Sequence, residues 1–457
     1  MEQDNSKDRE KNRLSRRVRR YASVGTGVGG VAARYAGQRF LGFGGDRASN
    51  AAALAAALGG LKGPLMKVAQ MLATIPEAIP AEYAAELRQL QSHAPAMGWP
   101  FVKRRMAAEL GADWRARFAE FGHDAAASAS LGQVHRAIGQ DGRDLACKLQ
   151  YPDMDSTVEA DLSQLELIFA IHRRMEQAID TRHIGAEIGS RLREELDYTR
   201  EARHMALYAA MLEAVPQVRV PGVVGELSTR RLLTMDWMAG RPILDYAGAP
   251  QEDRNRIAQA MFRAWWHPFS HYGVIHGDPH LGNYTVFEEG GEAAGINLLD
   301  YGCVRIFGPE FVGGVVDLYH GLRQDERARI VHAYETWGFS GLSNELIDIL
   351  NIWARFIYGP LLDDRVRSVA DGVKPAEYGR RQAFQVHRAL REKGPVTVPR
   401  EFVFMDRAAI GLGGVFVHLG AELNFFRLFN DEIADFSLGR VSARQSAALA
   451  ASGLAGA

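Results

Sequence analysis

Two carboxylates and one amide lie close enough in the sequence to act together. The stretch HGDPHLGN contains Asp278 and Asn283, five residues apart, and a Gly-rich turn then leads to Asp300 in LLDYG. We expect a loop and two short strands to bring these three side chains to one end of a hairpin. Carboxylate and amide oxygens are ligands that Mg²⁺ accepts beside phosphates. The stretch therefore predicts a site for a metal ion and a phosphate.

A lysine and a glutamate earlier in the chain extend this prediction to phosphoryl transfer. Chemistry of the kinase type needs a strand lysine, a helix glutamate that holds it, a catalytic Asp with an Asn five residues later, and a second Asp for the metal. Lys148 lies in the strand-like segment LACKLQY, and Glu201 is the best candidate to hold it. We expect Asn283 and Asp300 to bind the metal. Asp278 would orient or deprotonate the acceptor.

Each of these features taken alone has an ordinary structural explanation. A lone lysine in an apolar strand is usually an edge residue whose ammonium reaches solvent. HGD is equally well a turn in which His276 bonds backbone carbonyls, and DYG is a common turn ended by Gly302. The order and spacing of all four features favour the functional interpretation, because chance seldom produces them together.

The region before the lysine differs from an ordinary nucleotide-binding hairpin. Residues 125–135 read AAASASLGQVH instead of a Gly-rich cover, and side chains there limit the approach of the backbone to phosphates. We nevertheless assign nucleotide contacts to this loop, at Ala127, Ser128, Ala129 and Ser130. Met235 and Met238 follow the strand-like RLLT and suit either a hinge that reads adenine or a core strand that ends in a turn.

The pattern of predicted elements has the order of a protein-kinase-like fold. RFAEFG, GQVHRAIG and DLACKLQY alternate with turns and predict three antiparallel strands. Helical patterns follow at 155–178, 184–213 and 253–272, and the chain is mostly helical after 310. We expect an α+β, protein-kinase-like bilobal fold with a small antiparallel sheet lobe, a helical C-lobe and an N-terminal helical extension.

The predicted domain boundaries follow changes in composition along the chain. A basic, Gly/Ala-rich segment that is flexible or lies near a membrane is expected at 1–44, and a helical extension at 45–112, with helices at 81–92 and 99–110. The sheet lobe with a helical insertion is expected at 113–240. The helical lobe follows at 241–440, and a flexible tail at 441–457.

Composition excludes a disordered protein and a membrane-spanning one. The 457 residues are 47% hydrophobic and 24% charged, as in soluble globular proteins, and no apolar run is long enough to span a membrane. The two cysteines, Cys147 and Cys303, indicate a reducing compartment and are predicted to be core residues. Six cations and no acid lie between Lys11 and Arg20, which suits either a solvated tail or contact with anionic lipid. We expect a cytoplasmic protein, with peripheral contact at the inner face of a membrane as the alternative.

Several motifs in order resemble those of the AarF/UbiB atypical kinases, which are associated with coenzyme Q biosynthesis. The resemblance covers roughly residues 45–430 and begins with LKGPLMKVAQML, which is similar to the KxGQ helix of that family. SLGQVH, CKLQYPD, EELDYTREA, HGDPHLGN and DYG complete the set. Ala69, Ser128 and Leu281 depart from the usual motifs, but none of them replaces a charged or metal-binding group.

The resemblance implies a function and a set of regulatory residues. It implies ATP and Mg²⁺ as cofactors, and ATP hydrolysis or phosphoryl transfer that supports ubiquinone synthesis. The KxGQ helix would pack over the place where a protein substrate otherwise docks, with Lys67 and Gln70 facing Glu195 and Asp197. Without the resemblance, Lys67 and Gln70 would be read as an exposed helix face, and Glu195 and Asp197 as members of solvated ion pairs.

Two other function classes remain open from the sequence. Small-molecule phosphotransferases also use HGDxxxxN, and a catalytically silent lipid-binding scaffold could retain the fold. The expected partners are a nucleotide, a lipid or quinone-precursor ligand, a membrane surface and ubiquinone-biosynthesis proteins. We expect no nucleic-acid partner.

Overall fold

The computed structural model describes residues 97–456 apart from 130, 157, 160–161, 163–188, 191 and 371–398. The chain divides into two compact units. The sheet unit contains the described residues up to Thr199 together with Val224–Met235. The helical unit contains residues 200–223 and those from Asp236 onward. The chain thus changes unit close to the boundary expected at 240, but residues 200–223 belong to the helical unit.

The sheet unit is built on a five-stranded sheet with the order β1-β3-β4-β6, to which β2 adds by pairing with β3. The pairs β1–β3, β2–β3 and β3–β4 are antiparallel, as the sequence predicts for the three main strands. The elements are α5 (Trp99–Leu110), η1 (Trp114–Arg117), β1 (Phe118–Phe121), β2 (Ala127–Ala129), β3 (Gly132–Gly139), β4 (Asp144–Gln150) and β6 (Leu232–Asp236).

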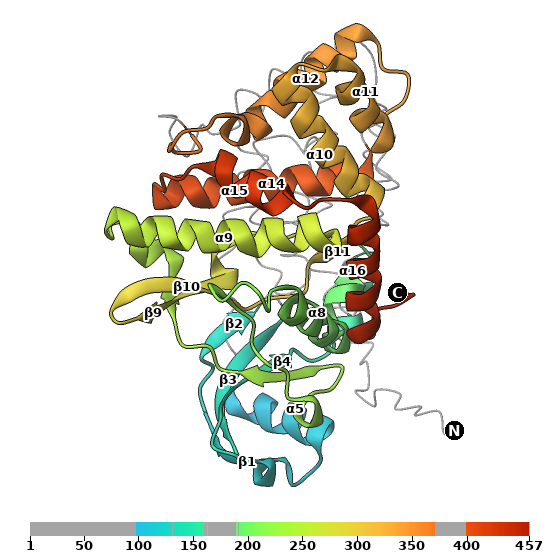
Figure 1. The fold of residues 1–457 in the computed structure, drawn as a ribbon. Coiled ribbons are helices and arrows are strands. Elements are labelled where there is room, and N and C mark those ends of the chain that lie inside the picture. The colour runs from blue at the N-terminus through green and yellow to red at the C-terminus, as the bar shows by residue number, and fades with distance from the viewer. Residues whose placement is uncertain are drawn as a thin grey trace, which may run out of the picture. The chain divides into compact units, whose positions relative to one another are not determined.

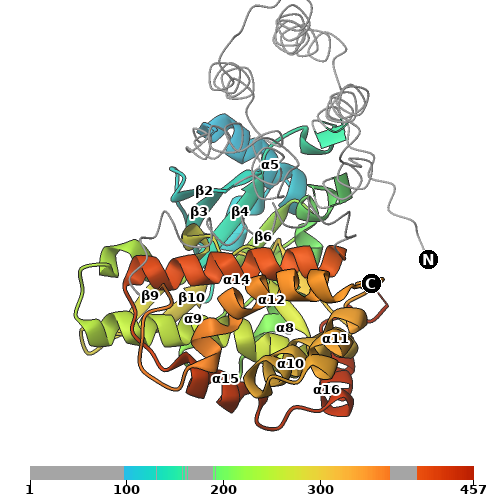
Figure 2. The same cartoon turned by 90° about the horizontal axis from the view of Figure 1, so that it is seen from above.

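Helix α5 belongs to the hydrophobic core of the sheet unit. Its residues Phe101, Val102 and Met106 are buried in one cluster with Leu145 and Leu149 of β4. Figure 2 shows the helix beside β3 and β4. The helix expected at 99–110 is therefore confirmed, and it packs as part of this unit.

The helix predicted over 184–213 is interrupted at Leu196 and Asp197. A new helix, α8 (Tyr198–Met211), starts directly afterwards. The carboxylate of Asp197 accepts the backbone N–H of Thr199 at 3.0 Å, which is the contact of a helix N-cap. The backbone N–H of Tyr198 donates to the carbonyl of Arg230 and not to a preceding helical turn. The prediction of one continuous helix was wrong because this Asp supports a helix start.

The helical unit contains two small sheets, one long helix and several shorter helices, among them α8 from Arg200 onward. One sheet has the order β5-β10-β9-β7, and the other pairs β8 with β11. The strands are β5 (Val218–Arg219), β7 (Arg241–Pro242), β8 (Val274–His276), β9 (Tyr284–Glu289), β10 (Glu292–Leu298) and β11 (Val304–Ile306). The helices are α9 (Gln251–Tyr272), α10 (Pro309–Gln324), α11 (Arg327–Thr336), α12 (Asn344–Tyr358), α14 (Arg400–Leu419), α15 (Phe425–Ile433) and α16 (Leu438–Ala451). Short turns of 3-10 helix are η2 (Gly225–Leu227) in the sheet unit and η3 (Ile243–Tyr246), η4 (Leu281–Asn283) and η5 (Gly359–Leu362) in the helical unit.

Helix α9 is the centre of the helical unit. It contacts β8 and β10 as well as α14, α15 and α16, and Figure 1 shows it between the β9–β10 hairpin and α14 with α15. Trp265, Trp266 and Phe269 of this helix are buried, as the sequence predicts. The helix ends at Gly273, whose φ of 66° is left-handed, and the chain then enters β8. A helix buried along one face therefore leads directly into the HGD segment.

The C-terminal residues differ from the expectation of a flexible tail at 441–457. Helix α16 continues to Ala451, and Val441 and Ala448 are buried. Gln445 donates to the backbone carbonyls of Tyr272 and Phe307. The helix is therefore held by two buried apolar side chains and by the Gln445 hydrogen bonds, while most of its alanines are exposed. Among the described residues, no helix is long and apolar enough to cross a membrane.

Candidate active site

The HGD and DYG segments are joined by backbone hydrogen bonds in the helical unit. Strand β8 pairs antiparallel with β11, so that His276 lies opposite Val304. The N–H of Gly277 donates to the carbonyl of Cys303 at 2.6 Å. A Cβ on Gly277 would lie 2.9 Å from the Cys303 sulfur, so this close approach requires glycine.

His276 links the two acidic residues of the site. Its Nε2 lies 2.6 Å from the carbonyl oxygen of Asp300, which can only accept, so Nε2 carries the proton. Its Nδ1 accepts from the backbone N–H of Asp278 at 3.4 Å. Both bonds are satisfied by one neutral tautomer. The buried imidazole therefore fixes the backbone on both sides of the site, as the structural interpretation of this His supposes.

The three metal and acceptor candidates are brought together, as the hairpin prediction requires. Asn283 follows the loop and its side-chain amide donates to the carbonyl of Asp278 at 3.0 Å. The carbonyl of Asn283 accepts the N–H of Leu299, which places it beside the residue before Asp300. The Asp300 carboxylate accepts the N–H of Gly302 at 2.9 Å, which sets its orientation. Asp278, Asn283 and Asp300 are all half-buried.

The pKa of Tyr284 reflects the nearby carboxylates of Asp278 and Asp300. Burial raises the pKa of the Tyr284 phenol, and the carboxylates of Asp278 and Asp300 raise it further. Two acids that both act on one buried phenol lie in one neighbourhood. Two carboxylates and an amide oxygen form a hard donor set, which fits Mg²⁺ by its chemistry.

Helix α8 supplies two buried residues behind the DYG segment, His204 and Tyr208, that the sequence analysis did not select, beside Glu201, which it did. His204 Nδ1 donates to the carbonyl of Tyr301 at 3.1 Å. The rings of Tyr208 and Tyr301 pack with centroids 5.4 Å apart, and Tyr301 is fully buried. Glu201, also buried, acts electrostatically on Tyr301. The i, i+3 and i+7 spacing of Glu201, His204 and Tyr208 was the available signal for a common helix face.

Lys148 is held in the middle of the sheet unit. It lies on β4 opposite Val134, between the buried Cys147 and Leu149, and is itself half-buried. Its ammonium lies 5.2 Å from the centre of the Tyr198 ring, within range of a cation–π interaction. Because Lys148 and Glu201 belong to different units, their ion pair stays a prediction.

The sheet unit also has polar residues around this strand whose role the sequence did not reveal. Gln133 in SLGQVH is fully buried, and its amide exchanges two hydrogen bonds with the backbone of Met97, 36 residues away. It also bonds His135 at 2.8 Å. Cys147 is fully buried and is a core residue, as expected, and this burial raises the pKa of its thiol to about 12.

The proposed nucleotide loop is a tight hairpin. Ala127 to Ala129 form β2, which pairs with β3 so that Ala129 lies opposite Gly132. Ser130 lies outside the described residues. A Cβ on Gly132 would overlap the carbonyl of Leu149 and lie 3.0 Å from the Tyr198 hydroxyl, so the glycine of SLGQVH allows the strands to approach. Nucleotide contact at this loop stays a prediction.

The residues predicted for the adenine hinge and for regulation lie at separate places in the chain. Met235 is buried in β6, which suits a core strand, whereas Met238 follows the strand and is half-buried. Asp197 caps α8, and Glu195 is half-buried in the preceding helical segment. Lys67 and Gln70 lie outside the described residues, so their pairing with Glu195 and Asp197 stays a prediction.

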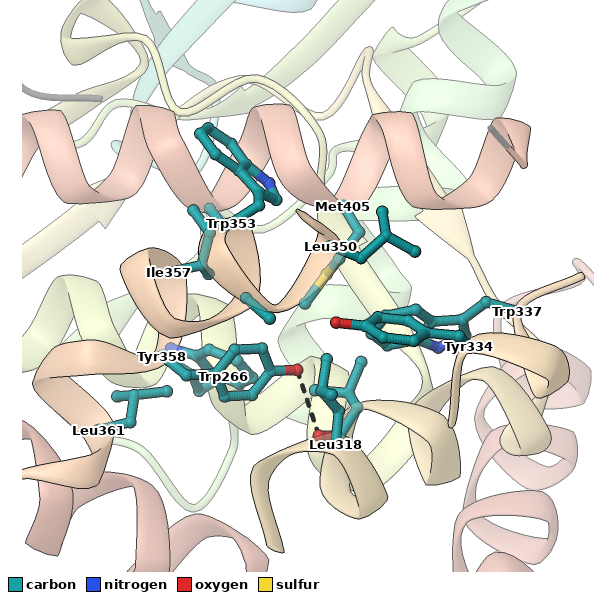
Figure 3. Close-up of a pocket in the computed structure, with 13 residues that line it drawn as sticks. Trp266, Leu318, Tyr334, Trp337, Leu350, Trp353, Ile357, Tyr358, Leu361 and Met405 are labelled. Carbon is teal, nitrogen blue, oxygen red and sulfur yellow. Dashed lines mark hydrogen bonds between the residues drawn. The ribbon is translucent and has the colours of Figure 1, made fainter. Parts of the chain in front are cut away.

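A separate apolar pocket lies among the helices of the helical unit. Figure 3 shows Trp266, Trp353 and Met405 at its walls, with Tyr334 and Trp337. The Tyr334 hydroxyl already bonds Asn351. The pocket volume of about 50 Å³ is small. A cavity that holds benzene measures about 150 Å³, so a quinone ring would require side chains to move.

Comparison with known proteins identifies the family of the chain. The sequence model of the ABC1 atypical kinase-like domain matches residues 89–334, more than half of the chain. The chain belongs to this family. The matched range contains Lys148, Glu201, Asp278, Asn283 and Asp300, and the resemblance drawn from the motifs is thereby confirmed.

Relatives and a solved structure agree with this assignment. The chain is 30% identical over 272 residues to AarF domain-containing protein kinase 1 of Xenopus laevis, covering 59% of this chain and 52% of that protein. It is 30% identical over 253 residues to the mitochondrial atypical kinase COQ8 of Saccharomyces cerevisiae, covering 55% and 50%. The chain thus spans about half the length of these curated relatives.

The solved structure supports the kinase-like mixed α+β fold. The Mycobacterium tuberculosis protein Rv3197, determined in complex with erythromycin, matches with a TM-score of 0.60 and 27% identity. The match covers 82% of this chain and 93% of Rv3197.

Proposed function

We propose that this member of the ABC1 family binds ATP with Mg²⁺ and hydrolyses it or transfers its terminal phosphoryl group, in support of isoprenoid-quinone synthesis. The observation that carries the proposal is the fixed arrangement of Asp278, Asn283 and Asp300 around His276. Phosphoryl transfer passes through a loose transition state, which needs positioned groups and neutralised charge. Residues that are already fixed in place meet this need before the substrate binds.

Each residue has a role in this proposal. Asn283 and Asp300 would hold the Mg²⁺, which neutralises charge on the phosphates when bound. The amide nitrogen of Asn283 is bound to the Asp278 carbonyl, so its oxygen is the group available to a cation. Asp278 orients the acceptor hydroxyl or water. Lys148 contributes a positive charge to the phosphates, and Glu201 holds Lys148.

The remaining candidate residues complete the proposal. Ala127–Ser130 cover the phosphates, and Met235 and Met238 flank the adenine. Lys67 and Gln70, with Glu195 and Asp197, restrict access of large substrates. A lipid or a phenolic quinone precursor is the ligand class that we connect with ATP turnover. Contact of the basic residues 11–20 with anionic lipid belongs to the same proposal.

Substitution of the DYG aspartate tests the proposal. Asp300→Asn keeps the size of the side chain and the bond to Gly302 but removes the charge that binds Mg²⁺. We expect the Mg²⁺-dependent rise in melting temperature with ATP to disappear, because a ligand that no longer binds the folded state cannot stabilise it. Unchanged stabilisation by Mg²⁺ and ATP would refute the assignment. Asp317→Asn, on α10 and paired with Arg329, is a control that should keep the full shift.

A further inference from the structure

Two histidines and a glutamate form a cluster between α9 and α15 that the proposed kinase chemistry does not use. His267 and His271 are four residues apart on α9, and their rings stack with centroids 4.2 Å apart. Glu432 of α15 places a carboxylate oxygen 3.0 Å from His267 Nδ1 and 3.7 Å from His271 Nδ1. The three side chains are only 18%, 16% and 10% exposed. Two helices thus present a compact set of nitrogen and oxygen donors.

The geometry of the cluster suits a divalent transition metal. One ligand atom from each residue can be chosen so that all three lie within 4.8 Å of one another. Zn²⁺ bound by imidazole nitrogens at about 2.0–2.1 Å in a tetrahedral site holds its ligand atoms about 3.3 Å apart, so the three side chains would move closer together on binding the ion. Two imidazoles and a carboxylate favour Zn²⁺ over Mg²⁺, which prefers oxygen ligands only.

Neighbouring groups prepare His271 to act as a ligand. Its Nδ1 lies 3.2 Å from the carbonyl of His267 and 2.9 Å from the Ser270 hydroxyl, which itself donates to the carbonyl of Trp266, so Nδ1 carries the proton. His271 therefore offers Nε2 to the ion, and its Nδ1, 3.7 Å from Glu432, is not the ligand atom. Metal-bound histidines commonly donate their other nitrogen to such a carbonyl. The carboxylate of Asp435 lies 3.7 Å from His271 Nε2. This carboxylate also forms ion pairs with Arg440 and Arg444.

We propose that His267, His271 and Glu432 form a site for Zn²⁺ that ties the end of α9 to α15. The site differs in ligands and in metal class from the Asp278, Asn283 and Asp300 site. Since α9 leads through Gly273 into β8, a bound ion would hold the helix that precedes His276. The expected consequence is a higher melting temperature with Zn²⁺ in the absence of nucleotide.

Cobalt substitution tests the site directly. The full chain is treated with a chelator, freed of it and titrated with Co²⁺, whose visible absorption is strong when bound by imidazoles in tetrahedral geometry. We expect one equivalent to give this absorption and Zn²⁺ to abolish it. Glu432→Gln, which retains the shape of the side chain, should lose the absorption and bind Zn²⁺ at least about tenfold more weakly, as removal of a metal ligand or its support does.

Controls separate this site from other places where the ion could bind. His332→Gln changes an exposed histidine of α11 outside the cluster and should keep the absorption. Asp300→Asn should also keep it, so failure of the proposed nucleotide site leaves this result intact. The proposal is overturned if the wild-type chain gives no such absorption, or if Glu432→Gln gives the same absorption as wild type. Loss of the absorption in Asp300→Asn but not in Glu432→Gln would equally overturn it.

Discussion

The two units hold their candidate residues by different means. In the helical unit, Asp278, Asn283 and Asp300 are fixed mostly by backbone hydrogen bonds between consecutive turns and strands. In the sheet unit, the strand that carries Lys148 is supported by buried polar side chains that reach across the chain. Arg105 of α5, for example, donates to the carbonyls of Gln150 and Tyr151, at separations of 45 and 46 residues. Local motifs therefore specify the first site, whereas the second depends on long-range contacts.

Breaking the buried network should affect the sheet unit most strongly. Arg105 also contacts Glu109 at 3.3 Å, with side chains 3% and 7% exposed, and Glu109 binds Arg231. Arg105→Met leaves a buried carboxylate with fewer partners and two carbonyls without their donor, so we expect a loss of about 3–5 kcal/mol. Hydrogen exchange should accelerate in peptides from 144–151 while peptides from 284–298 keep their protection.

An exposed pair in the same sheet is the matched control. Arg136 and Asp144 form an ion pair at 2.9 Å with side chains 55% and 48% exposed. Arg136→Met should cost under about 1 kcal/mol, because solvent screens exposed pairs. Equal effects of the two arginine substitutions would show that the buried network does not support the sheet unit.

The same contrast explains how far the sequence could predict the structure. The placement of the HGD and DYG segments beside each other was predictable because Asp278, Asn283 and Asp300 are separated by five residues and one hairpin, and the turn chemistry of Gly and Asp is local. The main strands and α9 followed from periodicity for the same reason. Gln133 and Arg105 were not predictable, because a buried polar residue is recognisable only from partners 36 to 46 residues away. The break before α8 was missed because Asp197 was read as one charge among many and not as a cap.

A packing change near the HGD loop should affect the helical unit. Gly411 of α14 lies against Pro279, so that an added Cβ would overlap the proline ring. We expect Gly411→Ala to cost about 1–3 kcal/mol by overpacking and to lower ATP turnover, since Pro279 adjoins Asp278. Thermal unfolding and steady-state ATPase assays measure both effects.

Gly414 on the same helix provides the control for that substitution. No atom lies within 4 Å of a Cβ built there. Gly414→Ala should therefore stabilise the helix by about 0.5–1 kcal/mol and leave turnover unchanged, because alanine is the better helix former. If Gly411→Ala behaved like Gly414→Ala, the contact with Pro279 would not position the loop.

The smallest expected effect is the contribution of His135, in the sheet unit, to the pH dependence of unfolding. Burial lowers the pKa of His135 below its ordinary value of 6.5, although the Gly122 carbonyl and Asp124 oppose the shift and His123 adds to it. Since the unfolded chain takes up the proton first, unfolding becomes easier as the pH falls below 6.5, and the loss stops below the folded-state pKa. His135→Gln should flatten this part of the urea-unfolding profile. His123→Gln, at a histidine with a side chain 65% exposed, should retain it. A profile that stays equally steep in His135→Gln would assign the dependence to another group, and the buried bond between His135 and Gln133 would then have no part in acid sensitivity.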